Sequence, residues 1–395
     1  MLTRKHTEIA LLLLLQLMLP APNTALQAQA DQRNYSLNGH LQDMQTLWIP
    51  DGSSRWQSMN QIKNRLDLRW YPSPAFSLHL GMRNNFSFGM MPQLYYPFMA
   101  DMAVSDPGYL DMTWLVAKDT SYFMTANFDR ALITYTTGGF RATLGRQRIN
   151  WGINSVWNPN DIFNTFDYFD FDYVERPGCD AVHLQYYTSA TSSAEAALKL
   201  DSKGRITMAA MYRFNSKGYD FQFLGGYMAG DYLLGAGWSG QIGGAGFSGE
   251  MSYFRPGESF ADSSGTFTGS MGANYTFGNS LMLQFEGLYN SAGTSGPAGM
   301  GTALFVSREV SAKSFTLARW SLFGNASYPL TPLVNLSMAA IFNPTDHSVF
   351  AGPTADISLT GNISFLLTAQ LFFGEDGTEF GGYGKLAFAR IKWDF

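Results

Sequence analysis

Charged side chains recur at every second residue in one segment, and polar side chains that include His79 and Arg83 recur in the next, a spacing that would let them bind and steer charged solutes. In residues 62–70 the odd positions are all charged, whereas the even positions are mostly apolar. The alternation continues in residues 76–88. Successive side chains of a β-strand point to opposite faces of a sheet. The charged faces therefore predict a basic, pore-lining wall formed by Lys63, Arg65, Arg69, His79, Arg83, Arg141, Arg390 and Lys392.

A second group of side chains that could act on solutes lies in one long segment, residues 149–178. This segment interleaves carboxylates with aromatic rings such as Trp157 and Phe163. So many rings would not be stable in water, and a long segment without regular structure is usually functional. We expect it to fold back, face the basic wall and narrow the passage, which would select solutes by charge and size. The residues expected at this constriction are Arg146, Arg148, Trp151, Trp157, Asp161, Asp167, Asp170, Asp172 and Glu175.

The sequence is equally compatible with another placement of this segment. It could cap the outer rim or pack against the neighbouring segment 89–120, and the basic side chains of the lumen would then only solvate each other. Conductance of the chain with and without residues 155–175 distinguishes the two hypotheses, because only a constriction changes the current when it is removed.

Strands must position these side chains, because strand-like segments separated by turn residues run through the whole chain beyond residue 35. Eighteen can be counted, and sixteen is the alternative if one weak glycine-rich hairpin is wrong. The predicted strands are residues 36–48, 57–70, 76–88, 121–136, 139–148, 179–188, 194–201, 205–214, 219–228, 232–242, 245–254, 266–277, 281–290, 314–328, 333–342, 347–360, 363–373 and 382–395.

The lengths of the connections support this count. Bacterial transmembrane barrels have short periplasmic turns and longer external loops on alternating sides. Every connection from an even-numbered to an odd-numbered strand is short here, as in Thr137-Gly138 and Gly361-Asn362. The long connections all fall on the other side, at residues 89–120, 149–178, 255–265 and 291–313. A missed or invented strand would break this alternation.

The composition indicates which medium covers the apolar faces of these strands. Charged residues make up 14% of the chain, compared with roughly 25% in soluble proteins. Aromatic residues make up 15%, and glycine accounts for 40 residues. Beyond residue 30 the sequence offers no run of amphipathic helices that could cover an apolar sheet face, so lipid is the expected cover. A secreted soluble array of β-sandwiches would share part of this composition and is the alternative.

A sheet edge open to lipid would leave backbone groups without hydrogen bonds, so such a sheet must close. The predicted fold is therefore all-β: a transmembrane antiparallel up-and-down β-barrel of about 18 strands. It forms a single domain, residues 31–395, with inserted loops 89–120, 149–178 and 291–313. A barrel of this size is wide enough for an aqueous channel.

The first thirty residues have the features of a cleavable signal peptide. Arg4, Lys5 and His6 precede an apolar run, and Ala28-Gln29-Ala30 fits a cleavage site. A buried N-terminal helix is the alternative, whereas a lipoprotein would need a cysteine after the apolar run. Cys179 is the only cysteine, so neither a disulfide framework nor a cysteine-based metal site is expected.

The end of the chain resembles a known assembly signal. Residues 388–395 alternate between apolar and polar side chains and end in Phe395. This pattern is similar to the terminal signal by which outer-membrane barrels of Gram-negative bacteria are recognised. The resemblance implies that Phe395 is an assembly signal, that the barrel-assembly machinery is a partner, and that outer-membrane lipid surrounds the strands.

A stretch near the long segment resembles the porin-like outer-membrane barrels of Gram-negative bacteria. It comprises Gly145 to Gly152, then Val156 to Asn164, then Arg176-Pro177-Gly178. The resemblance covers only a small part of the chain, and it implies a passive pore without a defined substrate. It also implies that this stretch aims the long segment, with its arginines holding the carboxylates of the segment. An ordinary strand end and aromatic girdle would explain the same residues.

Enzymatic and cofactor chemistry find little support. The histidines beyond residue 30 lie far apart in sequence and in no nucleophile pattern: His40, His79, His183 and His347. The aspartates of segment 149–178 lack the Gly-centred spacing of a calcium loop. We therefore expect no catalytic residues, no metal site, no cofactor and no nucleic-acid partner.

These features predict a porin-like outer-membrane channel for passive diffusion of small hydrophilic solutes, with a preference for anions as the finer hypothesis. The alternative is a non-conducting or weakly conducting surface barrel that binds polysaccharide or a partner protein. Aromatic residues of the external segments would suit carbohydrate stacking, namely Tyr95, Tyr96, Phe98 and Tyr109. The sequence does not decide between a single copy and a homo-oligomer.

Overall fold

The computed structural model describes residues 34–170, 176–262, 264–297 and 310–395. Its strands form one antiparallel sheet that closes on itself, because β1 pairs with β2 on one side and with β19 on the other. The ring runs through β1 (Tyr35–Ile49), β2 (Gln57–Ser73), β3 (Phe76–Phe88), β5 (Tyr122–Thr137), β6 (Phe140–Gln147), β7 (Cys179–Ser189), β8 (Ser192–Leu200), β9 (Ile206–Ser216), β10 (Tyr219–Met228), β11 (Asp231–Ile242), β12 (Ala245–Pro256), β13 (Thr266–Thr276), β14 (Met282–Asn290), β15 (Trp320–Thr331), β16 (Val334–Phe342), β17 (Val349–Ser358), β18 (Ile363–Phe373) and β19 (Lys385–Asp394).

These eighteen strands confirm the predicted all-β barrel and its predicted strand number. Most bounds differ from the prediction by a few residues. The largest difference is in β15, which begins at Trp320 instead of residue 314. Within residues 314–319, Ser314 and Ala318 form isolated bridges in the preceding connection instead.

The sequence reading missed three short elements in residues 89–120. They are α2 (Met90–Leu94), α3 (Phe98–Ala103) and β4 (Thr113–Asp119). None has the length or alternation that makes an element visible in sequence. Among the described residues, no helix is long and apolar enough to cross a membrane.

The outer face of the barrel is apolar, as the alternation predicted. Side chains such as Leu234, Leu144 and Phe285 are exposed on it, with Leu234 at 71%. The alternate positions of the barrel strands face the lumen and hold polar residues such as Gln222 on β10 and Glu250 on β12. The apolar outer face indicates a barrel that lies in lipid.

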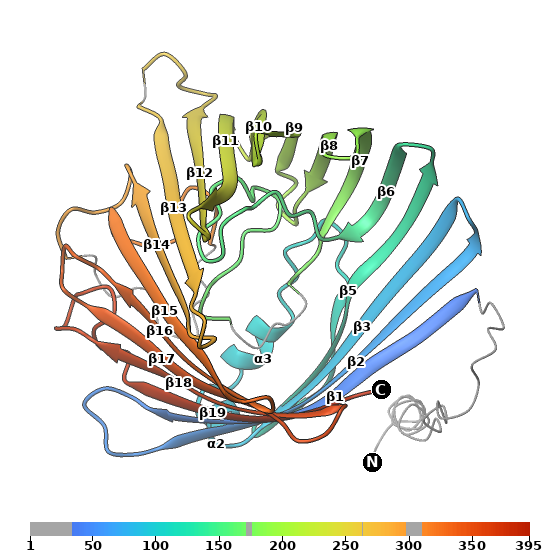
Figure 1. Cartoon of the computed structure of the whole chain (residues 1–395). Helices are drawn as coiled ribbons and strands as arrows, with labels where there is room; N and C mark the ends of the chain where they lie inside the picture. Colours follow the sequence, from blue (N-terminus) through green and yellow to red (C-terminus); the bar gives the residue numbers. More distant parts are fainter. Residues whose placement is uncertain (1–33, 171–175, 263, 298–309) are drawn as a thin grey trace.

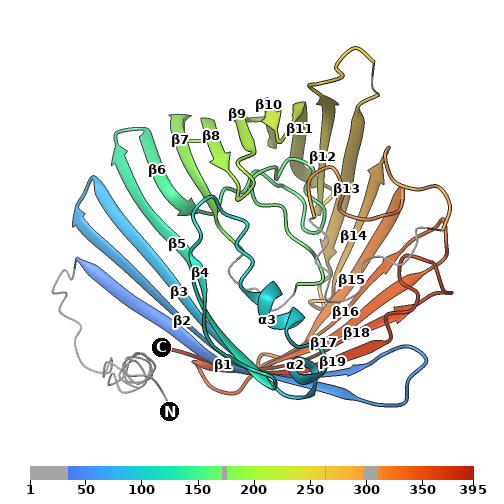
Figure 2. The ribbon, with the colours of Figure 1, turned by 180° about the vertical axis from the view of Figure 1, so that it is seen from behind.

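One long connection lies inside the barrel. Figures 1 and 2 show the green segment that follows β6 within the ring of strands from both sides, together with α3. Because neighbouring strands are antiparallel, residues 148–178 leave the wall at the end opposite to Tyr35 and Asp394. The described part of this connection, which we call the inserted segment, therefore enters the lumen from that end.

The wall itself is completed by a segment from another connection. Ala131 to Thr137 of β5 pair with β6, whereas Tyr122 to Asn127 of β5 pair with β4. β4 thus continues the line of β6, which ends where the chain turns into the lumen. On the far side, Gly108 forms a bridge with Asp201, just beyond β8. Residues 106–119 therefore fill the gap that the inward turn leaves in the wall.

Candidate functional site

A cavity of about 710 Å³ inside the barrel is lined mainly by positively charged side chains. Five arginines line it, against a single carboxylate, that of Glu195. Four of these guanidinium groups form no ion pair with any residue that the structure describes. We call this space the basic cavity; its charged lining residues are Arg69, Arg130, Arg141, Arg148, Arg213 and Glu195.

Strand register brings these arginines into the lumen from several strands. Arg69, Arg141 and Arg213 occupy inward positions near the strand ends that carry the short turns. Arg148 lies at the other end, where the chain leaves β6, and Arg130 lies between. The arginines therefore follow the length of the lumen along one side.

The one carboxylate of the basic cavity has partners of its own. Glu195 lies 2.9 Å from the ring nitrogen of His183 and accepts a hydrogen bond of 3.1 Å from the indole of Trp151. The carboxylate of Glu195 is thus bound by the wall and the inserted segment, and the arginines outnumber it in the cavity.

The inserted segment is fixed to the opposite wall mainly by Glu250 on β12. This buried carboxylate accepts hydrogen bonds from the backbone N–H groups of Ile153, Asn154 and Asn160. The bonds from Asn154 and Asn160 measure 2.7 and 2.9 Å. One side chain therefore holds two turns of the segment in place.

Glu286 on β14 repeats this arrangement further along. Its carboxylate accepts the N–H of Trp157 at 2.6 Å and that of Val156 at 3.1 Å. Carboxylates that accept backbone N–H groups form charge-assisted hydrogen bonds, which are stronger than neutral ones. Glu250 and Glu286 therefore act as two anchors, and they were not among the predicted site residues.

Close packing reinforces the anchors. Asn160 is fully buried and donates to the carbonyl of Ala236 at 3.0 Å. A Cβ atom on Gly235 would lie 2.7 Å from Asn160 Oδ1, and one on Gly237 would lie 2.7 Å from the side chain of Ile153. The segment approaches β11 so closely that these two positions require glycine.

The aromatic rings of the segment pack against the inner wall. Trp151 contacts Phe163 edge to face, with ring centroids 4.9 Å apart. Phe169 contacts Phe350 of β17 at 4.9 Å in the same geometry. These rings are thereby removed from water, in agreement with the reasoning from sequence that they would not be stable in it.

Asp161 lies in the interior of the segment, 1% exposed. Burial raises the pKa of its carboxyl to about 6, although Arg148 and Arg176 nearby favour the charged form. The backbone N–H groups of Trp151 and Asn164 are directed toward it and also favour the charged form. The carboxylate is therefore enclosed rather than presented to solutes.

A second cavity of about 460 Å³ lies on the other side of the segment, against β14 to β18. Asp167, Asp170 and Arg176 contribute to it from the segment. The wall side is uncharged and polar, and consists of Gln284, Asn325, Ser337, Thr354, Thr368 and Gln370 together with apolar residues. The segment thus separates a side of the lumen with a basic wall from a side with an uncharged wall.

Of the eight residues predicted to line the pore, Arg69, His79 and Arg141 lie in the basic cavity. Arg65 faces inward but is only 2% exposed, because Asp67 and Asp129 bind its guanidinium group. Asp129 is the extra residue of a β-bulge in β5. Arg65 is thus a buried ion-pair partner instead of a free lining charge.

The other predicted lining residues form a group beside the closure of the barrel. Lys63 and Lys392 occupy inward positions on either side of Gln42, on β2 and β19. Arg83 stands opposite Arg65, and Arg390 stands opposite Met44 and is buried. Lys392 also forms an ion pair of 3.0 Å with Asp394.

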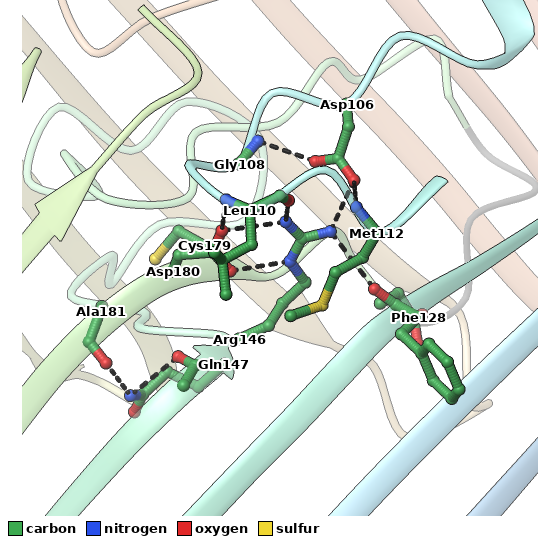
Figure 3. Close-up of polar contacts among 12 residues, drawn as sticks. Asp106, Gly108, Leu110, Met112, Phe128, Arg146, Gln147, Cys179, Asp180 and Ala181 are labelled. Carbon is green, nitrogen blue, oxygen red and sulfur yellow. Dashed lines mark hydrogen bonds and ion pairs between the residues drawn. The ribbon is translucent and has the colours of Figure 1, made fainter. Parts of the chain in front are cut away.

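The expected role of Arg146 is wrong. Figure 3 shows that its guanidinium group binds Asp106 at 2.7 Å and both carboxylate oxygens of Asp180, at 2.8 and 2.9 Å. It also donates to the carbonyl of Leu110. Arg146 occupies an outward position of β6, next to the segment that completes the wall. It therefore fastens the wall and does not hold carboxylates of the inserted segment.

Asp106 is the matching half of this contact. Burial opposes its ionisation, but Arg146 and the N–H groups of Gly108 and Met112 lower its pKa below the ordinary value. A Cβ atom on Gly108 would lie 2.0 Å from the guanidinium of Arg146. The segment that completes the wall, residues 106–119, passes directly over Arg146. No local sequence pattern reveals this contact.

The remaining constriction residues have separate positions. Trp151 and Trp157 are buried in the packing of the segment. Arg148 lines the basic cavity, and Asp167 and Asp170 line the second cavity. Asp172 and Glu175 lie outside the described residues. Of the described carboxylates of the segment, Asp167 and Asp170 therefore lie away from the basic cavity, and Asp161 is enclosed near Arg148.

Two arginines of the basic cavity, Arg130 and Arg213, were missed from sequence. Arg213 follows an alternating strand pattern and could have been found by extending the same reasoning to β9. Arg130 could not, because the bulge at Asp129 shifts the alternation of β5. Among the described residues, no group of three or more His, Cys, Asp or Glu side chains is arranged to hold a metal ion.

No protein-family model matches the chain, and no curated protein matches it in sequence. Solved structures match its fold. OccAB4 of Acinetobacter baumannii superposes with a TM-score of 0.58 at 7% identity, over 92% of this chain and 99% of the other. OccAB2 of the same organism gives 0.59 at 8% identity, over 91% and 98%. OprD of Pseudomonas aeruginosa gives 0.55 at 11% identity, over 92% and 94%. The chain therefore has the closed barrel fold of outer-membrane porins.

Proposed function

We propose that this chain is an outer-membrane channel through which small hydrophilic anions diffuse passively. The observation that carries the proposal is the basic cavity, in which Arg69, Arg141, Arg148 and Arg213 form no ion pair with a described residue and follow the lumen from one end toward the other. Its fold, shared with outer-membrane porins, supports the general function of a channel. The preference for anions rests on the arginines.

The arginines would act as a series of weak sites. Conduction requires that a solute binds well enough to enter and weakly enough to leave, which several adjacent sites provide. An anion that leaves Arg148 meets Arg141 or Arg213 along the same side of the lumen. A cation meets the same charges as a barrier.

The inserted segment would set the width of this path. Glu250 and Glu286 hold it against β12 and β14, and the arginines lie on the other side of it. We infer that the constriction lies between the segment and the arginine-bearing strands. This revises the hypothesis from sequence, because backbone and packed rings of the segment, not its carboxylates, would form the narrow side.

Reversal potentials in planar bilayers test the anion preference. Under a KCl gradient the protein should favour chloride, and Arg141→Gln with Arg213→Gln should shift the reversal potential toward that of a non-selective pore. Arg55→Gln is the matched control, because Arg55 is exposed in the connection between β1 and β2. Cation preference in the unaltered protein, or equal shifts in the control, would contradict the proposal.

A surface barrel that binds polysaccharide is the second candidate. It is favoured by exposed rings on the connection that carries α3, namely those of Tyr96, Phe98 and Tyr109. Swelling of liposomes with neutral sugars of graded size separates the candidates. A channel admits the small sugars and excludes the large ones, whereas a binder that does not conduct admits none.

Export and assembly complete the proposal. Residues 1–30, the proposed signal peptide, lie outside the described residues. At the other end, Phe395 extends the closing seam, because its N–H and carbonyl groups exchange hydrogen bonds of 2.9 Å with Gly39. We propose that Phe395 also serves the barrel-assembly machinery. Removing it should lower the amount of folded barrel in outer membranes while the unfolded protein is still exported.

A further inference from the structure

The outer face of the barrel has one polar patch. On β5 to β19 the outward positions carry no charged or amide side chain, except within two residues of a strand end. On β1 to β3 five such side chains stand at outward positions further inside the strands. They are Asp43, Gln45, Asn60, Asn64 and Asn84, which we call the polar patch.

Strand register makes the patch continuous. Gln45 pairs directly with Asn60 across β1 and β2, and Asn64 pairs with Asn84 across β2 and β3. Asp43 stands opposite Ile62, between the two asparagines of β2. Asp43 and Gln45 are exposed, and Ile62 is 43% exposed on the same face. Asn60 and Asn64 are half-buried, and Asn84 is buried at the edge of the patch.

The outward orientation of these side chains is fixed by their neighbours. Asp43 and Gln45 stand opposite Ile391 and Ala389 of β19, on the face where Ile391 is exposed. The residues of β1 that alternate with them, Gln42, Met44 and Thr46, are buried on the lumen side. Asp43 is the ninth of fifteen residues of β1, so it lies near the middle of the strand.

Such a patch is unfavourable against lipid. A carboxylate in the hydrocarbon region of a membrane has lost its water, and polar residues there are usually covered by protein. Gln45 donates one hydrogen bond of 2.9 Å to Asp43, which leaves that carboxylate with further acceptor capacity. A protein surface that supplies donors would remove the cost.

We propose that the polar patch is the interface with a second copy of this chain, arranged about a two-fold axis. The patch is complementary to itself, since Asp43 accepts hydrogen bonds and the amide of Asn60 donates them, whereas the amide of Asn64 donates to the carbonyl of His40 at 3.4 Å. A two-fold axis brings the same surface of both copies together. A ring of three or more copies would instead set the patch against a different face, and all other faces are apolar at this depth.

Cross-linking in intact outer membranes tests this geometry. Ile62→Cys places a thiol in the centre of the patch, and Cys179 is buried and can stay in place. A bis-maleimide should convert this variant into a dimer of the chain. Leu234→Cys on β11 is the matched control, because Leu234 is exposed on the outer face away from the patch. Its cross-linked yield should be at least about tenfold lower.

The mass of the purified full-length protein in mild detergent gives a second measurement. The unaltered protein should contain dimers, and Asp43→Leu should raise the dimer dissociation constant at least about tenfold, because a hydrogen bond to a charged group is lost. This substitution keeps an apolar outer face, so the barrel should still fold. Monomers alone, a dimer unaffected by Asp43→Leu, higher oligomers, or a cross-link to a different protein would each overturn the proposal.

Discussion

Replacing Glu250 by Gln should detach the inserted segment from the wall for part of the time. The carboxylate of Glu250 accepts three backbone N–H groups, two at one oxygen and one at the other. The amide of Gln keeps one acceptor oxygen and turns an NH₂ group toward the remaining N–H. At least one hydrogen bond to a charged group is lost, about 2 kcal/mol.

This loss sets the size of the expected effect. About 2 kcal/mol corresponds to about a thirtyfold rise in the ratio of detached to attached segment. The backbone pairing of β12 with β11 and β13 does not involve the side chain, so the barrel should stay intact. The effect should therefore appear in the channel and not in the stability of the barrel.

Single-channel recording measures it. The Glu250→Gln variant should show steps to a larger conductance, and these should occupy about thirtyfold more of the recording time than in the unaltered protein. Combining it with Glu286→Gln should increase them further, because Glu286 holds two more N–H groups. Glu258→Gln is the control, since Glu258 is exposed in the connection between β12 and β13.

Unchanged conductance and current noise in the double variant, with the barrel folded, would refute the reasoning. The hydrogen bonds of the two glutamates would then contribute nothing to the position of the segment. An increase of equal size in Glu258→Gln would refute it as well, because that residue does not contact the segment.

Two further predictions concern buried charges. The pKa of Asp161 is raised to about 6, so its folded form binds a proton more tightly than the unfolded chain, and attachment of the segment should weaken as pH rises from about 4 to 6. Current noise should accordingly be greater at pH 7.5 than at pH 5, and Asp161→Asn should reduce this difference. If the variant shows the same pH dependence of the noise, groups other than Asp161 cause it. Gly81→Ala should destabilise the barrel by about 3 kcal/mol, because its Cβ atom would lie 2.8 Å from Arg65 Nη2 and 2.9 Å from Asp129 Oδ1 and would disturb a buried ion pair. Thermal unfolding checks this against Gly278→Ala, whose Cβ atom meets nothing within 4 Å.

The strands could be predicted from sequence because lipid imposes a strict rule on them. Every outward position of a strand such as β14 has to be apolar, and Leu283, Phe285 and Tyr289 follow that rule at every second residue. The short turns then fixed the direction of each strand. Periodicity of this kind is local, so one segment at a time suffices to recognise it.

The contacts inside the lumen could not be predicted in this way. Glu250 stands in a glycine-rich strand, and its partners begin with Ile153, nearly a hundred residues earlier. Arg146 precedes the inserted segment but binds Asp106, which belongs to the wall. Such pairings depend on where two connections meet in space, and neither the residue types nor their spacing records it.

The completion of the wall by residues 106–119 has a consequence for engineering this barrel. The inward turn after β6 removes part of a strand, and β4 with the residues before it replaces that part. The two connections are therefore one exchangeable unit. If residues 148–178 are replaced here by a short turn, β6 can extend along β5 and compete with β4 for the same backbone hydrogen bonds. The same conflict arises in a barrel that receives residues 148–178 without a segment equivalent to β4. Residues 106–119 have to be exchanged in the same step.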